Sequence, residues 1–230
     1  MKRELFRQLL ADRAAKRSVA LVTLLESGAQ WLVYPHTVAG DLPVDLADAA
    51  RRLLREDRSA VAESAAGKAF VEVFNTPLRL IIVGAVHIAQ ALVPMARSAG
   101  YQVIVIDPRR AWTSETRFPD VEITDEWPDD AMRRLAPDRR TAVVTLTHDP
   151  KLDDPALHVA LRSQAFYVGS LGSRKTHAGR VARLKEAGFT DAEIARIHAP
   201  IGLDIGAESP AEIALAILAQ VVQVLHAEPA

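Results

Sequence analysis

The sequence predicts an α/β protein in which helices cover both faces of a parallel sheet, preceded by a small α+β unit. From Leu78 onward, short apolar runs alternate with stretches of helical length, which is the pattern of a parallel sheet buried on both faces. Before that point, helical stretches alternate with short runs joined by turn residues, as in hairpins. The turn-forming residues 75–77 separate the two parts, so we expect domains at 1–77 and 78–230.

The first domain is expected to hold a helix, a hairpin, a second helix and a second hairpin. Apolar residues recur at helical spacing from Leu5 to Ala14, and Val19 to Leu25 is a run of strand length. Turn residues then lead into a second strand at 31–34. We expect the next helix to begin at Asp45, whose carboxylate can accept hydrogen bonds from free N–H groups, and the second hairpin to turn at Gly67.

The second domain is expected to contain four buried strands with helices between and after them. Two helix starts are marked by a hydroxyl residue followed three positions later by glutamate, at Thr190 and at Ser209. Pro210 strengthens the second of these. The expected strands are 78–83, 103–106, 141–146 and 166–168, and the expected helices are 88–99, 129–135, 155–162, 174–187, 191–197 and 210–225.

Composition excludes several functional classes. The chain has 28 Lys and Arg against 29 Asp and Glu, a balance that disfavours a nucleic-acid partner or an acidic membrane surface. It has no Cys, so disulfides, thiolate metal sites and a Cys nucleophile are excluded. The seven His show no metal-ligand spacing. No apolar stretch approaches the roughly 20 residues of a transmembrane helix, and we expect a cytoplasmic protein.

The first strand of the second domain is followed by a turn that resembles a dinucleotide fingerprint. Gly84, Ala85 and His87 open the next helix, and Asp107 follows the next strand. In that fingerprint, backbone N–H groups bind a pyrophosphate and the later acid receives ribose hydroxyls, which predicts a Rossmann-like fold. Val86 stands where a second glycine is expected. An NAD(P)-dependent oxidoreductase is therefore one possible function, and structural roles for Gly84 in a tight turn and Asp107 in capping remain open.

Polar side chains also follow the strand at 141–146. His148 and Asp149 are placed where an open α/β sheet binds ligands, and they are candidates for proton transfer or ligand contact. Asp153 or Asp154, followed by Pro155, has the composition of an ordinary helix start. We therefore assign these two acids to capping.

A loop rich in glycine and serine follows the strand at 166–168 and enters a helix that opens with two basic residues. Free N–H groups, hydroxyls, a helix dipole and cations meet there, which suits a phosphate. Ser173 could equally cap the helix, and the basic residues from Arg174 to Lys185 could form a solvated face. A later loop at 198–207 has Asp204 as its only acid. The expected phosphate ligands are Gly169, Ser170, Gly172, Ser173, Arg174 and Lys175.

Six segments, taken in order, resemble the Rossmann domain of the XdhC/CoxI family of accessory proteins for molybdenum hydroxylases such as xanthine dehydrogenase. They read GAVHIAQAL, VIVIDPR, ETRFP, LTHDPKLDDPAL, FYVGSLGSRKTH and HAPIGLDIGAESPAEIALAILA, and the resemblance covers 78–225. It implies a carrier that holds the molybdenum cofactor, a molybdopterin, during sulfuration and passes it to the apo-hydroxylase. Such a role needs a phosphate cradle, which the loop at 169–175 would supply.

The resemblance also implies partners and a site. The implied partner is the apo-hydroxylase, and a sulfurtransferase is a second candidate. Because a lone Rossmann domain with a small appended unit often self-associates, we also expect a homodimer. Members of the family carry glycine at the position of Val86 and longer N-terminal domains with a Gly-Gly-Cys-Val-Glu stretch, which this chain lacks. A scaffold that keeps only the protein interface is a third possible function. The residues expected to line the site are Gly84, Ala85, His87, Asp107, Arg109, His148, Asp149, Gly169, Ser170, Gly172, Ser173, Arg174, Lys175 and Asp204.

Overall fold

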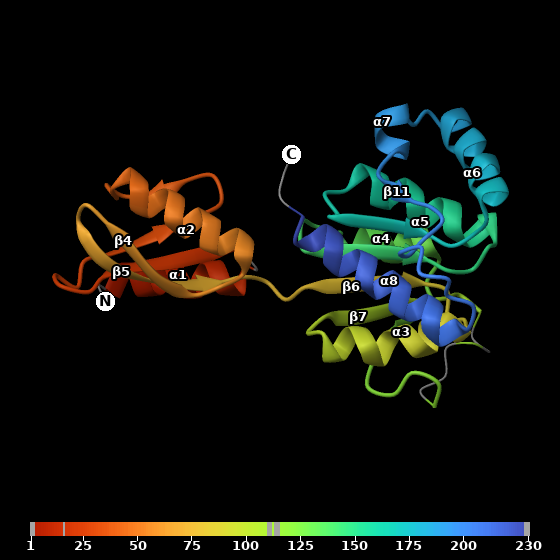
Figure 1. The fold of residues 1–230 in the computed structure, drawn as a ribbon, viewed down its shortest axis with the longest axis horizontal. Helices are drawn as coiled ribbons and strands as arrows, with labels where there is room; N and C mark the ends of the chain where they lie inside the picture. Colours follow the sequence, from red (N-terminus) through yellow and green to blue (C-terminus); the bar gives the residue numbers. More distant parts are fainter. Residues whose placement is uncertain (1–2, 16, 110–111, 113–115, 228–230) are drawn as a thin grey trace. The chain divides into compact units, whose positions relative to one another are not determined.

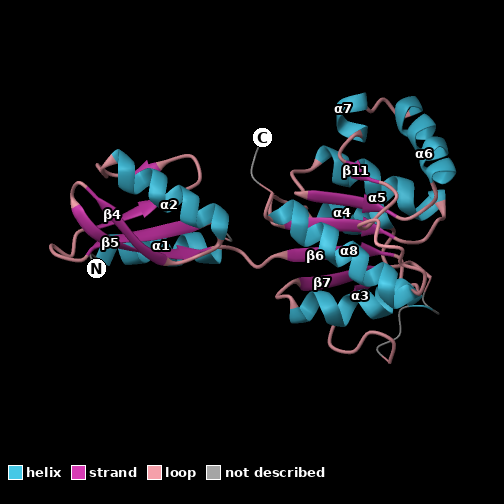
Figure 2. Ribbon diagram, in the orientation of Figure 1, coloured by secondary structure: helices cyan, strands magenta, loops and turns pink. Residues whose placement is uncertain are grey.

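The computed structural model describes residues 3–15, 17–109, 112 and 116–227. The chain divides into two compact units, Met1–Thr76 and Pro77–Ala230. In each unit the helices pack against that unit's own sheet (Figures 1 and 2).

The first unit is an antiparallel sheet with a helix on each face. Its strand order is β3-β2-β1-β5-β4. Alternate residues of β1 point to opposite faces, as the pleat of a strand requires: Ala20 and Val22 pack with the buried face of α2, whereas Val19 and Leu21 pack with Leu9 of α1. The elements are α1 (Arg3–Ala14), β1 (Val19–Leu24), β2 (Gln30–Val33), β3 (Val38–Ala39), α2 (Val44–Glu56), β4 (Ala60–Ser64) and β5 (Gly67–Phe74).

The second unit is built on a parallel six-stranded sheet in the order β11-β10-β9-β6-β7-β8. This confirms the expected α/β class and its Rossmann arrangement. The elements are β6 (Arg79–Val83), α3 (His87–Ser98), β7 (Gln102–Ile106), β8 (Glu122–Thr124), α4 (Pro128–Leu135), β9 (Thr141–Thr145), α5 (Pro150–Arg162), β10 (Tyr167–Ser170), α6 (Arg174–Glu186), α7 (Asp191–Ile194), β11 (Ile197–His198) and α8 (Pro210–Leu225).

Helices cover both faces of this sheet. Leu80 and Ile82 of β6 belong to a buried cluster with α3 and α8, and Ile81 and Val83 belong to a second cluster with α4, α5, α6 and α7. Because both faces are covered, all of these strand residues are apolar rather than alternating with polar ones. Figure 1 shows α8 crossing in front of the sheet. Ligands of open α/β sheets bind at the edge where the parallel strands have their carboxyl ends.

Three expected helices differ from the structure. Helix α5 begins at Pro150 rather than Pro155, because Asp149 caps it by accepting a hydrogen bond from the Lys151 N–H (2.9 Å). The stretch expected as a helix at 191–197 ends at Ile194, and a short strand follows at the sheet edge. Helix α2 begins at Val44 rather than at Asp45, and the Asp45 carboxylate accepts a hydrogen bond from the Leu46 N–H in the first turn (2.9 Å), as expected.

Both expected capping boxes are present. In α8 the Ser209 hydroxyl accepts from the Glu212 N–H and the Glu212 carboxylate accepts from the Ser209 N–H, and Thr190 and Glu193 make the same pair in α7. None of the helices in the described ranges is long and apolar enough to cross a membrane.

Candidate functional site

The candidate site lies where the chain reverses its direction of travel across the sheet. From β6 the chain moves outward to β7 and β8 and then returns to β9 on the other side, so the loops after β6 and β9 flank the switch point. Gly84 allows these loops to meet. Its φ is 110°, and a Cβ there would lie 2.5 Å from the Thr147 methyl group. The glycine is thus required for packing between the two loops.

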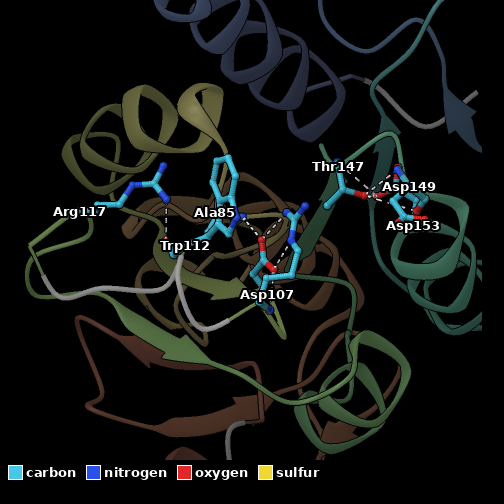
Figure 3. Close-up of polar contacts among 8 residues, drawn as sticks. Ala85, Asp107, Trp112, Arg117, Thr147, Asp149 and Asp153 are labelled. Carbon is cyan, nitrogen blue, oxygen red and sulfur yellow. Dashed lines mark hydrogen bonds and ion pairs between the residues drawn. The ribbon is translucent and has the colours of Figure 1, made fainter.

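Asp107 follows β7 at this edge and is completely buried. Its Oδ2 accepts from the Ala85 N–H (2.8 Å) and from Nη2 of Arg109 (2.7 Å), and its Oδ1 accepts from the Arg109 N–H (3.0 Å) and Nε (2.9 Å). Figure 3 shows the contact with Ala85. A carboxylate has about four acceptor positions, so Asp107 is fully used inside the chain. Burial acts to raise its pKa, but the hydrogen bonds from Arg109 and Ala85 outweigh burial and lower it.

This geometry assigns Asp107 a positioning role. It fixes the turn after β6 and holds the Arg109 guanidinium at the edge of the sheet. No lone pair of Asp107 remains for ribose hydroxyls, so the dinucleotide interpretation loses the acid on which it depended. Direct ligand contact by Gly84, Ala85 and Asp107 stays a prediction.

Arg109 faces the loop after β9. The hydrogen bond to Asp107 raises the pKa of Arg109, and the negative charges of Asp149 and Asp153 raise it further. Its guanidinium also lies 5.2 Å from the ring centre of Trp112, and Arg117 lies 5.1 Å from the same ring. Arg117 belongs to the segment 115–119 of the family resemblance, in which Glu115 lies outside the described residues.

The loop after β9 is organised by Thr147. Its hydroxyl donates to Asp153 Oδ1 (2.6 Å) and accepts from the Asp149 N–H (3.1 Å), and Figure 3 shows the three residues grouped together. Asp149 caps α5, so at least part of its function is structural. His148 is exposed and has a φ of 62°. Its role in ligand contact or proton transfer stays a prediction, as does that of Asp149.

The assignment of Asp153 and Asp154 to helix capping is wrong. Both lie inside α5, and Asp153 is only 1% exposed. Its pKa is raised because burial disfavours the carboxylate, although hydrogen bonds from Thr147 oppose this. Asp154 instead forms a two-point ion pair with Arg183 of α6. Two acids in succession thus have different hydrogen-bond partners, Thr147 for Asp153 and Arg183 for Asp154.

The glycine- and serine-rich loop is only partly available to a phosphate. Ser170 ends β10, is fully buried, and its hydroxyl shares a 2.6 Å hydrogen bond with Thr145. Ser173 caps α6 by accepting from the Thr176 N–H. Arg174 and Lys175, in contrast, are exposed at the start of the helix. Phosphate binding by the residues from Gly169 to Lys175 stays a prediction.

A cavity of about 290 Å³ lies beside this loop, between the start of α5 and the helix α6. Its lining combines both acids of α5 with three cations of α6 and with His148. Of the residues predicted for the site, only His148 and Lys175 line it. His87 and Asp204 are exposed elsewhere on the second unit. The lining residues are His148, Pro150, Asp153, Asp154, Lys175, Thr176, Gly179, Arg180 and Arg183.

Arg180 lines the cavity, and sequence reasoning did not identify it as a site residue. It was expected on a solvated face, but it is 2% exposed and donates through Nη2 to the Leu171 carbonyl (2.9 Å). Among the described residues, no group accepts from its buried Nε and Nη1 atoms. Burial lowers its pKa, and the nearby Asp153 and Asp154 oppose this. The sequence signal for its position was the spacing of three residues between Arg180 and Arg183, because residues at this spacing share one face of a helix. Here that face of α6 lines the cavity beside α5.

Within the ranges that the structure describes, no group of three or more His, Cys, Asp and Glu side chains is placed to hold a metal ion.

The family model described as the XdhC Rossmann domain matches residues 80–221. The chain belongs to the XdhC family. The match takes in β6 to β10 and most of α8, and so includes both loops at the switch point and the cavity beside α6.

Two curated proteins are similar to most of this chain. The uncharacterized protein YqeB of Escherichia coli K12 is 30% identical over 193 residues, which are 77% of this chain and 33% of that protein. The molybdenum cofactor insertion chaperone PaoD of the same organism is 34% identical over 156 residues, 67% of this chain and 43% of that protein. The chain thus spans less than half the length of these curated relatives.

A crystal structure described as a xanthine dehydrogenase from Bacillus halodurans is similar to nearly the whole of this chain. It has a TM-score of 0.70 and 26% identity, and the comparison covers 97% of this chain and 67% of that one. The similarity therefore includes the first unit as well as the Rossmann domain.

Proposed function

We propose that this chain is a maturation factor for a molybdenum hydroxylase of the xanthine dehydrogenase or CO dehydrogenase type. It binds the molybdenum cofactor as cargo, supports its sulfuration and inserts it into the apo-enzyme. In this role the chain is a carrier rather than a catalyst. The chemistry at molybdenum belongs to the cargo and to the partner proteins.

One observation carries the proposal for this member of the XdhC family. Cationic side chains from the β7 side of the sheet and from two positions of α6 surround the loop after β9. Arg109 interacts electrostatically with Asp153 from the β7 side, and Arg180 does so from α6. Lys175 lines the same cavity as Arg180. An anionic, phosphate-bearing ligand at the carboxyl ends of β9 and β10 would meet Lys175 and Arg180 in the cavity, within the electrostatic influence of Arg109. The named role of PaoD in cofactor insertion agrees with such a ligand.

The absence of cysteine bears on where the sulfur for the cofactor comes from. A thiol of this chain cannot carry sulfur to molybdenum, because the sequence has none. We therefore propose that a separate sulfurtransferase delivers the sulfur while this chain holds the cofactor. We also propose a homodimer, which light scattering would detect as a mass of twice 25.1 kDa.

Binding measurements on the purified protein test the proposal. Molybdenum cofactor should bind saturably, whereas NAD(H) and NADP(H) should not, because Asp107 has no free acceptor for ribose. Lys175→Ala should weaken cofactor binding about tenfold or more, since a hydrogen bond to a charged group contributes about 1.5–3 kcal/mol. Calorimetric titration measures both effects.

Lys185→Ala is the matched control for this substitution. Lys185 lies on the same helix and pairs with Asp191 on the surface (2.7 Å), and it does not line the cavity. Its removal should leave cofactor affinity unchanged. Saturable binding of a nicotinamide nucleotide without binding of the cofactor would contradict the proposal and return attention to an oxidoreductase.

A further inference from the structure

The cavity between α5 and α6 contains two buried side chains of opposite charge whose hydrogen bonding is incomplete. Arg180 has no acceptor for Nε and Nη1, and Asp153 has no donor to Oδ2, among the described residues. Both side chains line the cavity. A buried polar group without a partner destabilises the fold by about 1–3 kcal/mol, and by more when it is charged. A ligand that supplied the missing partners of these two groups would remove that cost.

Arg180 and Asp153 are close enough to influence each other. The charge of Asp153 favours the protonated form of Arg180, and the charge of Arg180 favours the ionised form of Asp153. Nevertheless, no hydrogen bond joins them, because Asp153 Oδ1 is held by Thr147 and Arg180 Nη2 is held by the Leu171 carbonyl. Oδ2 of Asp153 and Nε and Nη1 of Arg180 thus stay without a hydrogen-bond partner among the described residues.

The other charged residues of the cavity define that group further. Asp154 and Arg183 neutralise each other in their ion pair. Lys175 is exposed at the first turn of α6. It adds a positive charge that pairs with no acid among the residues that the structure describes. Besides His148, which also lines the cavity, the remaining charged side chains are Lys175, Arg180 and Asp153, a set that suits an anion presenting a hydrogen to Asp153.

We propose that this cavity binds a protonated oxyanion, either hydrogen phosphate or the phosphate of a monoester. Its unprotonated oxygens accept from Arg180 and Lys175, and its P–OH donates to Asp153 Oδ2. Asp153 in its ionised form can only accept, so a fully ionised oxyanion of the same shape, such as sulfate, would bring lone pairs against its lone pairs. The preference for phosphate over sulfate thus depends on one proton of the ligand. Use of the cavity by the phosphate of a pterin rests on the proposed function, whereas the oxyanion site does not.

The test compares inorganic phosphate with sulfate at about pH 7, where phosphate keeps a proton and sulfate has none. The unmodified protein should bind phosphate at least about tenfold more tightly than sulfate, as expected for the loss of a charge-assisted hydrogen bond. In Asp153→Asn the amide replaces the acceptor at Oδ2 with a donor, so the preference for phosphate should disappear and sulfate affinity should rise. Calorimetry gives both constants.

This substitution should preserve the fold. Asparagine keeps the carbonyl that Thr147 donates to, and it removes a charge that burial disfavours. Lys175→Ala provides an independent variant at an exposed position, where binding of both anions should weaken by about tenfold. Lys185→Ala should change neither.

Two further titrations complete the test. The first distinguishes a phosphate monoester from the free phosphate ion, and the second shows whether the oxyanion site exists without the proposed carrier function. Phenyl phosphate is compared with inorganic phosphate at about pH 5.5, below the second pKa of a monoester at about 6, so that both ligands keep a P–OH. Binding as tight as that of inorganic phosphate would support a monoester, and exclusion of phenyl phosphate would support the free ion. Phosphate selectivity without any binding of molybdenum cofactor would keep the oxyanion site and reject the carrier role. Equal affinities for phosphate and sulfate in the unmodified protein, an unchanged ratio in Asp153→Asn, or no binding at millimolar phosphate would overturn the site.

Discussion

Asp107→Asn is expected to lower the free energy of unfolding of the Rossmann unit by about 3 kcal/mol or more. Asp107 is completely buried whereas Arg109 is 37% exposed, so the loss comes from the buried Ala85 N–H and from the charge-assisted hydrogen bonds of Arg109, and each contributes about 1–3 kcal/mol. Here the amide would turn a donor toward either Arg109 or the Ala85 N–H, both of which donate to Asp107. Urea unfolding measures the loss, and hydrogen exchange of the β6 amides assigns it to this unit.

The pH dependence gives this prediction a second readout. The folded-state pKa of Asp107 is lowered, so its contribution to stability is present above the unfolded-state pKa of about 3.9 and is lost as pH falls through the folded-state value. The stability difference between the unmodified protein and Asp107→Asn should therefore shrink as pH falls below about 4. A difference that stays constant with pH would contradict this account of Asp107.

Asp138→Asn is the matched control for Asp107→Asn. Asp138 also pairs with an arginine and has a lowered pKa, which burial opposes and the hydrogen bond from Thr141 favours. Its side chain is half-exposed, however, and its partner Arg79 also donates to main-chain carbonyls. Its substitution should destabilise the unit by less than that of Asp107. If Asp107 served only to bind a nucleotide, the two variants would not differ in this order.

Gly84→Ala is expected to have the second large effect, a loss of about 3 kcal/mol or more of unfolding free energy. Two terms add. A residue with a side chain at a φ of 110° is strained by about 1–3 kcal/mol. The new Cβ would also lie 2.5 Å from the Thr147 methyl group and 3.3 Å from its backbone nitrogen, and overpacking of this kind costs about 1–3 kcal/mol.

Gly100→Ala separates these two terms. Gly100 has a φ of 88°, but a Cβ there would meet nothing within 4 Å. It should therefore show the strain alone, and its unfolding free energy should fall by less than that of Gly84→Ala. Equal losses in the two variants, measured by urea unfolding, would show that the contact between the loops after β6 and β9 is unimportant.

The strands and most helix starts could be predicted because the signals are local. The apolar runs of β6, β7 and β9 are long enough to identify without knowledge of their neighbours, and the capping boxes at Thr190 and Ser209 depend on residues only three positions apart. The start of α5 was wrong for a related reason. Both Pro150 and Pro155 are followed by helical sequence, and only the geometry of the Asp149 cap decides between them.

The site was harder to predict because it depends on contacts between distant residues. The position of Asp107 was expected, but the four hydrogen bonds that occupy it involve the backbone of Ala85 and the conformation of Arg109, which no pattern encodes. Arg180 and Asp153 belong to residue types that are rarely fully buried. Their burial follows from the packing of α6 against α5, so only the structure brings them into one cavity.

Reconstitution of a cofactor-free molybdenum hydroxylase tests the carrier role most directly. Apo-hydroxylase would be mixed with molybdenum cofactor and a sulfurtransferase, with or without this chain, and the appearance of hydroxylase activity would be followed. We predict that activation requires the chain, needs the sulfurtransferase because the chain has no cysteine, and slows about tenfold with Lys175→Ala but not with Lys185→Ala. Activation at the same rate without the chain would contradict its role as a maturation factor.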